Sequence, residues 1–143
     1  MDSRENEFEG ASVTQISMDV DDLLQFFDDA KAEGKNRLND ADRENINMVD
    51  EYLKEMDITF GNRIKGQMED FVPVYVACGG TKEEAIDYLI THKILRKLDE
   101  RYEPYLVTRL DDLEQGLNEI YGDGTFEQSL KKIKKLRDKI QGK

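Results

Sequence analysis

Apolar residues recur at intervals of three and four positions along most of this chain, and this period constrains its fold more than any other feature. Val20, Leu23, Leu24 and Phe27 form the first such stripe, which is one helical face wide. The same spacing returns in five further segments, separated by glycines, a proline or an Asn-Asp pair. No pair of strands with alternating apolar and polar residues is evident. We therefore predict an all-α fold, a compact bundle of about six helices.

Capping signals place the ends of the predicted helices. Thr59 is expected to cap the third helix, and Thr81–Glu84 and Thr125 with Gln128 have the spacing of capping boxes. Pro73 lies inside the third helix and is expected to kink it or to end it about one turn early. The predicted helices lie near residues 17–33, 41–56, 61–78, 82–98, 104–121 and 126–140.

The length of 143 residues fits one domain with a single core. We predict a flexible N-terminal segment at residues 1–16 and a single helical domain at residues 17–143. No run of about 18 apolar residues is present, so we predict no membrane span. The first ten residues are polar and acidic, which argues against a secretory signal peptide and makes a cytoplasmic location the expectation.

The net charge of −11 is distributed unevenly. Residues 1–60 carry 17 acids and 6 bases, whereas residues 61–143 carry 15 of each. Phosphate binding needs a basic face, so the acid excess argues against direct DNA binding and favours a solubilising surface.

Two local basic groups leave alternatives open. Lys93, Arg96 and Lys97 are either a solvated face paired with Asp99 and Glu100, or a contact to a neighbouring subunit or to DNA. The last predicted helix carries five lysines, Lys131, Lys132, Lys134, Lys135 and Lys139, which are spread around its circumference more than they line one stripe. They form either a solvated surface or a contact to DNA or a partner.

The residue types of common catalytic and metal sites are scarce. Cys78 is the only cysteine, which excludes an internal disulfide, and we expect it to be a small buried apolar residue. His92 is the only histidine and is expected on a helix surface. No phosphate-binding G-x-x-x-x-G-K-[ST] motif and no H-E-x-x-H motif occurs. We predict no catalytic residue and no metal site in this chain.

One stretch resembles a known family. Phe60-Gly61-Asn62-Arg63-Ile64, then Glu84-Ala85-Ile86-Asp87, then Lys93-Ile94-Leu95-Arg96-Lys97-Leu98, is similar in order and spacing to the C-terminal helical region of McrB-type AAA+ ATPases. These are the motor subunits of modification-dependent restriction systems and their relatives. The resemblance covers roughly residues 45–120. Arg96 stands where the family usually has proline, which allows the helix to continue, and Asn62 replaces a commoner aromatic residue.

The resemblance implies a lid domain that has no activity alone. In such lids an arginine at the start of a helix, called sensor 2, approaches the γ-phosphate of the nucleotide; Arg63 occupies that place, with Gly61 and Asn62 beside it. The implied cofactor of the parent protein is ATP or GTP with Mg. The implied partners are the nucleotide-binding core of the same ATPase, neighbouring ring subunits and a nuclease. The core with its Walker motifs is missing from this sequence.

Two alternatives stand beside this interpretation. Arg63 is equally expected to pair with Asp57 or Glu69 on the surface, which would give it a structural role only. The whole chain also fits a small acidic helical interaction or adaptor protein without nucleotide chemistry.

Overall fold

The computed structural model describes residue 25 and residues 37–143 of the chain. The elements in this part are α2 (Asp40–Lys54), α3 (Gly61–Ala77), α4 (Lys82–Leu89), the π-helical segment η4 (Ile90–Ile94), the 3-10 segment η5 (Leu95–Leu98), α5 (Tyr105–Tyr121) and α6 (Glu127–Gln141). Every regular element described is helical, which confirms the predicted all-α class. The first predicted helix and the segment 1–16 lie outside the described residues, apart from Gln25.

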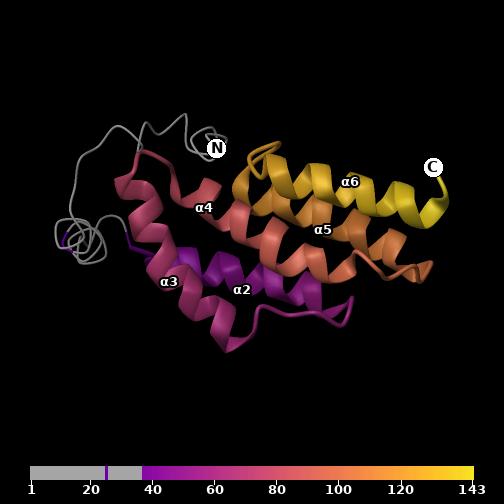
Figure 1. Ribbon diagram of the computed structural model, residues 1–143, viewed down its shortest axis with the longest axis horizontal. Coiled ribbons are helices and arrows are strands. Elements are labelled where there is room, and N and C mark those ends of the chain that lie inside the picture. The colour runs from indigo at the N-terminus through magenta and orange to yellow at the C-terminus, as the bar shows by residue number, and fades with distance from the viewer. Residues whose placement is uncertain (1–24, 26–36) are drawn as a thin grey trace, which may run out of the picture.

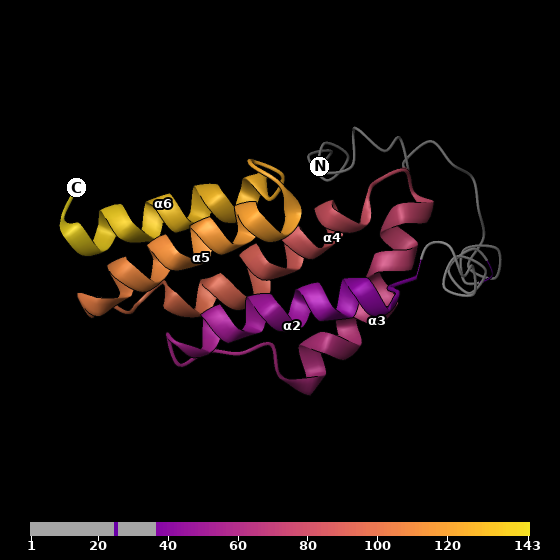
Figure 2. The ribbon, with the colours of Figure 1, turned by 180° about the vertical axis from the view of Figure 1, so that it is seen from behind.

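The helices form a bundle with one element running across it. α5 packs against α2 and α6, while α4 packs against α3 and α6. Figures 1 and 2 show α5 and α6 side by side along the long axis, with α3 crossing steeply at the end of the molecule away from the C-terminus. Within the described residues, no helix has the length and apolar character needed to span a membrane.

A single core is built from the apolar stripes of all these helices. The stripe of α2 is a typical case, because its predicted members Ile46, Val49, Leu53 and Met56 are all buried. Burying one leucine side chain contributes roughly 1.5–3 kcal/mol relative to leaving it exposed. Leucines of α4, η5, α5 and α6 join it: Leu89, Leu95, Leu98, Leu106, Leu110, Leu113, Leu117 and Leu136.

The winding of the fourth helical segment changes twice between Leu89 and Leu98. The π-helical η4 is followed by the tighter η5, so the register of side chains shifts along this segment. Both Ile94 and Leu95, on either side of the change in winding, are completely buried. Arg96 is exposed, and the expected continuation of the helix at this position is confirmed as far as Leu98.

The observed α3 bears on two expectations. The helix passes through Pro73 and ends at Ala77, so the early end does not occur, and the kink that was its alternative stays a prediction. Val72 and Pro73 are both buried, and this tertiary packing holds the helix where one backbone donor is missing. Cys78 is exposed rather than buried, because it caps the last turn of α3, which extends beyond the core.

The start of α6 is capped by another helix instead of by its own sequence. The predicted capping box of Thr125 and Gln128 is wrong, because Phe126 is the N-cap residue and no side chain of the local sequence caps the helix. Instead, Asp87 in α4 accepts from the Gln128 amide at 2.9 Å and from the Ser129 amide at 2.8 Å. The Ser129 hydroxyl also donates to Asp87, at 2.6 Å. The box at Thr81 and Glu84, by contrast, is confirmed at the start of α4.

Candidate functional site

The start of α3 is held by a buried carboxylate from α2. Asp50 is 5% exposed, and its Oδ1 atom accepts from the Thr59 hydroxyl at 2.8 Å and from the Phe60 amide at 3.0 Å. The sequence position of Thr59 predicted that it would cap α3, and this prediction is wrong. Its hydroxyl donates to Asp50 instead. These bonds fix the two residues that precede Gly61, the first residue of the helix.

We call the hydrogen bonds from Thr59 and Phe60 to Asp50 the Asp50 clasp. Phe60 and Gly61 set the direction in which α3 continues from it. The Phe60 side chain is 1% exposed and fills the core. Gly61 has φ +69°, in the left-handed region that glycine adopts without steric cost. A Cβ atom added at Gly61 would meet nothing within 4 Å. The backbone conformation, and not a lack of space, is therefore what requires glycine here.

The three residues that the sequence assigned to phosphate binding lie together at this point. Gly61, Asn62 and Arg63 are all exposed, in the first turn of α3. Among the described residues, Arg63 forms no ion pair. The two carboxylates considered as its partners are engaged elsewhere: Glu69 binds Arg43, and Asp57 accepts a long hydrogen bond of 3.4 Å from Tyr105. The surface pairing expected as the alternative for Arg63 is therefore not formed.

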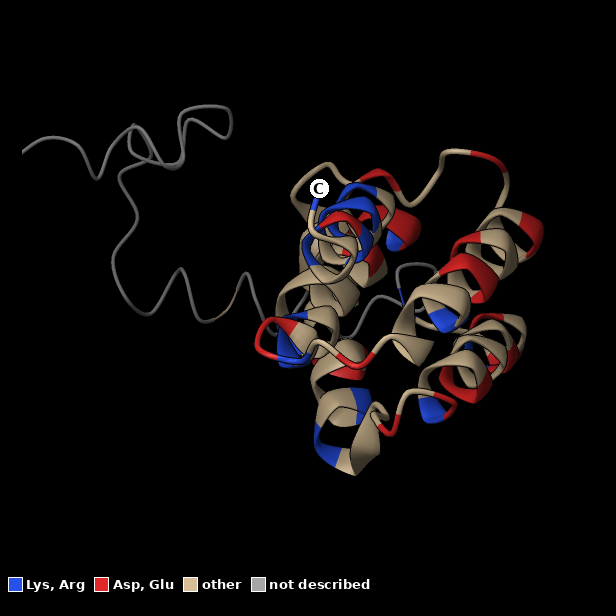
Figure 3. Ribbon diagram, turned by 90° about the vertical axis from the view of Figure 1, so that its right-hand side faces the viewer, with Lys and Arg blue, Asp and Glu red and all other residues tan. Residues whose placement is uncertain are grey.

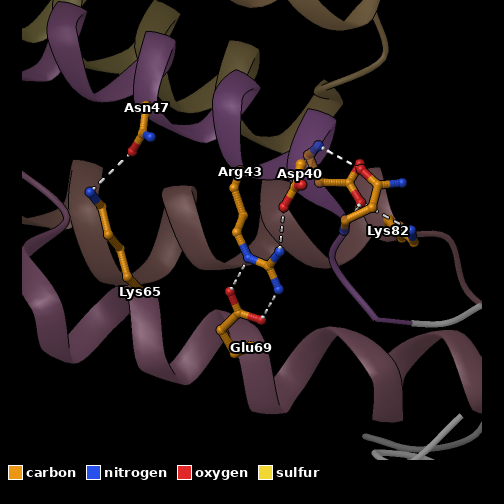
Figure 4. A network of polar contacts seen from close by, with 8 residues as sticks. Asp40, Arg43, Asn47, Lys65, Glu69 and Lys82 are labelled. Atoms are coloured by element: carbon orange, nitrogen blue, oxygen red, sulfur yellow. Dashed lines mark hydrogen bonds and ion pairs between the residues drawn. The ribbon is translucent and has the colours of Figure 1, made fainter. Parts of the chain in front are cut away.

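Figure 4 shows how Glu69 is taken up by the neighbouring helix. Arg43 of α2 makes a two-pronged contact with it, from Nε at 2.8 Å and from Nη2 at 3.1 Å, while Nη1 contacts Asp40 at 3.2 Å. The hydrogen bond that Arg43 donates to Glu69 raises the pKa of Arg43 further above its ordinary value. One turn away, Lys65 donates to Asn47 at 3.1 Å. These contacts tie α3 to α2 and leave its first turn uncovered.

The first turn of α3 differs electrostatically from those of α2 and α4. α2 and α4 each begin with a capping box and with two acidic residues in the first turn. α3 has neither an acidic residue there nor a side-chain cap. The carboxylate of Asp50, from α2, accepts the amide of Phe60 just before the helix, but the exposed first turn itself carries no acidic residue, and Arg63 adds a full positive charge there. This arrangement can bind an anion, and a guanidinium fork suits phosphate oxygens.

Two carboxylates that hold the bundle together were not predicted from the sequence. Asp50 and Asp87 are buried, at 5% and 3% exposure. A signal for both was present, because each falls on the apolar stripe of its helix: Asp50 follows Ile46 by four positions, and Asp87 precedes Ile90 by three. A buried carboxylate needs donors, which the starts of the neighbouring helices supply.

Comparison with known families covers nearly the whole chain. Residues 15–143 match the model of a family described as "Domain of unknown function (DUF8727)". The chain belongs to this family. The match includes the clasp at Asp50, the first turn of α3 and the cap at Asp87. Searches of curated proteins and of solved structures found no match.

Proposed function

We propose that this domain is the helical lid of a McrB-like AAA+ NTPase, in which Arg63 contacts the phosphates of a nucleotide bound by a separate core. The observation that supports this most is the state of Arg63. It is exposed, it has no ion pair among the described residues, and it lies in a first helical turn that carries no acidic residue, beyond the Asp50 carboxylate that binds the preceding Phe60 amide. In an acidic protein, an arginine in such a place is available for an anion from outside the domain.

The clasp below Arg63 gives this role a physical basis. A group that stabilises charge on a transferring phosphoryl group must be held in place before the reaction. The Asp50 bonds and the buried Phe60 ring fix the chain just before α3, so the helix start has little freedom to move. The exposed surfaces at Asn62 and Arg63 leave room for the core domain to approach.

The test is Arg63→Ala in the ATPase ring that contains or binds this domain. We expect nucleotide hydrolysis to fall by at least tenfold, because arginines in such positions contribute large factors to phosphoryl transfer. The Arg63→Lys variant should hydrolyse nucleotide little faster than Arg63→Ala, since an ammonium group lacks the planar fork of donors of a guanidinium. A matched control is Arg109→Ala, another partly exposed arginine, whose contacts to Glu55 and Asp112 are surface ion pairs.

Two further measurements separate this role from a structural one. The isolated Arg63→Ala domain should unfold at the same urea concentration as the unchanged domain, because the side chain has no partner to lose. The 143-residue chain alone should give no heat on titration with ATP or GTP, since it carries no phosphate-cradling motif. Hydrolysis that is unchanged in an intact Arg63→Ala ring would refute the proposal.

A further inference from the structure

A basic groove lies between the η4–η5 segment and α6, on elements separate from the start of α3. Its volume is about 460 Å³. The charged and titratable side chains that line it are His92, Arg96, Asp99, Lys131, Lys132 and Lys135. Figure 3 shows Lys and Arg positions on the helix that ends at the C-terminus, α6. The groove is thus a concentration of positive charge on a chain whose net charge is −11.

Most cations of the groove have no ion-pair partner among the described residues. Asp99 is the acidic member of the lining, and Lys132 binds it. Within the described part of the chain, Arg96, Lys131 and Lys135 form no ion pair. Other cations of this domain, such as those on α2 and α5, are paired with carboxylates. Unpaired cations that collect in one groove of an acidic protein indicate an anionic partner.

The groove brings together cations from both basic segments of the sequence, around Arg96 and in α6. Lys93, Arg96 and Lys97 are exposed, as one alternative expected, but among the described residues none of them pairs with Asp99 or Glu100, and Asp99 instead binds Lys132. The α6 lysines also fall into two sets. Lys131, Lys132 and Lys135 face the groove, whereas Lys134 pairs with Asp138 and Lys139 donates to three backbone carbonyls at the end of η5 and beyond.

A row of aromatic rings leads from α3 into the same groove. Phe71 and Tyr88 are stacked with ring centroids 5.8 Å apart, and Tyr88 and His92 lie 4.4 Å apart. Tyr75 extends the row, at 5.6 Å from Phe71. Tyr88 is 41% exposed, and His92 reaches Gln128 at the start of α6. His92 belongs both to the row of rings and to the groove lining, so the exposed Tyr88 lies beside the groove, whereas Phe71 and Tyr75 are partly buried against the core.

We infer that this surface binds single-stranded nucleic acid, with the phosphates along the groove and a base against Tyr88 and His92. Cations that track the backbone and exposed rings that stack on bases are the two components of such binding. The rings decide between the partners. An acidic peptide would use the cations and leave the rings without a role, and the bases of a duplex are already stacked on each other.

The excess of acid in the chain limits the affinity without abolishing it. At physiological ionic strength, charges further apart than about 8 Å are largely screened from each other. A phosphate in the groove therefore interacts mainly with Arg96, Lys131 and Lys135. Three such contacts predict a log–log dependence of the binding constant on salt with a slope of about −2.

The experiment is fluorescence anisotropy of a short fluorescein-labelled oligothymidylate, titrated with the full chain at low salt and repeated at rising salt. The double variant Lys131→Glu/Lys135→Glu should lose at least tenfold in affinity. Tyr88→Ala should lose about fivefold or more, through the lost stacking. All of these positions are exposed, and circular dichroism checks that each variant remains folded.

Matched controls separate the groove from general charge and from the proposed lid function. Lys134→Glu also reverses a charge on α6, but outside the groove, and should change the affinity less than twofold. Tyr102→Ala, which removes an exposed ring elsewhere, should leave it unchanged. Arg63→Ala should leave it unchanged too, since this binding does not depend on the lid role. The proposal is overturned if the oligonucleotide does not bind at low salt. It is also overturned if Lys134→Glu weakens binding as much as the double variant, or if polyglutamate or duplex DNA binds equally well and Tyr88→Ala has no effect.

Discussion

The starts of α3 and α6 are both stabilised from outside the helix, but over different distances along the chain. Each helix begins without a local side-chain cap, and each is held by a buried aspartate from an earlier helix. Asp50 reaches only ten residues along the chain, whereas Asp87 reaches 41 and 42 residues. The first clasp therefore orders a local turn, and the second joins two distant parts of the bundle.

The two carboxylates also differ in how their oxygens are used. Oδ1 of Asp50 accepts the bonds from both Thr59 and Phe60, with a second contact from the hydroxyl to Oδ2 at 3.1 Å. Lys54 and Lys65 lie 3.9 and 4.0 Å from its other oxygen. Asp87 uses both oxygens for backbone amides. One clasp thus depends mainly on a single acceptor atom, and the other needs two acceptors at once.

Asp87→Asn should give the largest effect, a loss of about 3 kcal/mol in the free energy of unfolding. The amide group of asparagine would place an N–H against a backbone N–H, whichever way it is turned, and would leave a buried donor unsatisfied. Urea unfolding followed by circular dichroism measures the loss through the shift in midpoint at a constant slope.

The matched comparison for this variant is Asp87→Ala, which removes both acceptors. The two should be about equally unstable if two acceptors are required. An Asp87→Asn protein within 1 kcal/mol of the unchanged chain, on the scale of one ordinary hydrogen bond, would contradict the two-acceptor description.

Asp50→Asn should cost less, about 1 kcal/mol. Its remaining carbonyl oxygen can keep the bonds from Thr59 and Phe60, and the change removes mainly the attraction to two partly exposed lysines. The same urea titration tests it. If Asp50→Asn proves as damaging as Asp87→Asn, the distinction between a single-acceptor and a two-acceptor clasp fails.

The local parts of this fold could be predicted from the sequence, and the contacts between distant segments could not. The period of apolar residues locates every helix of the described part, because each one must bury a stripe. The capping box at Thr81 was predicted since all its atoms come from four consecutive residues. At α6, however, the acceptor comes from Asp87, and no local pattern identifies a partner 41 residues away.

In the candidate site, too, the local features were predictable and the contacts between distant segments were not. The position of Arg63 at a helix start was predictable, because Gly61 and the stripe that follows define where α3 begins. Its lack of a partner was not, because Glu69 is taken by Arg43 from another helix. The basic groove was also hidden, since its cations come from two segments separated by more than thirty residues.

Thr125→Ala should have the smallest effect, a change within about 0.5 kcal/mol in the free energy of unfolding. It tests whether α6 is capped by Asp87 or by its own sequence. If Asp87 is the true cap of α6, the Thr125 hydroxyl contributes nothing to the helix start, although its sequence position is that of a cap. Thr59→Ala is the matched control: this second threonine with a cap-like position donates to Asp50, and its removal should cost about 1 kcal/mol. Both proteins unfold in the same urea assay. Equal losses at the two threonines would mean that α6 depends on its own sequence after all, and that Asp87 is not what holds it.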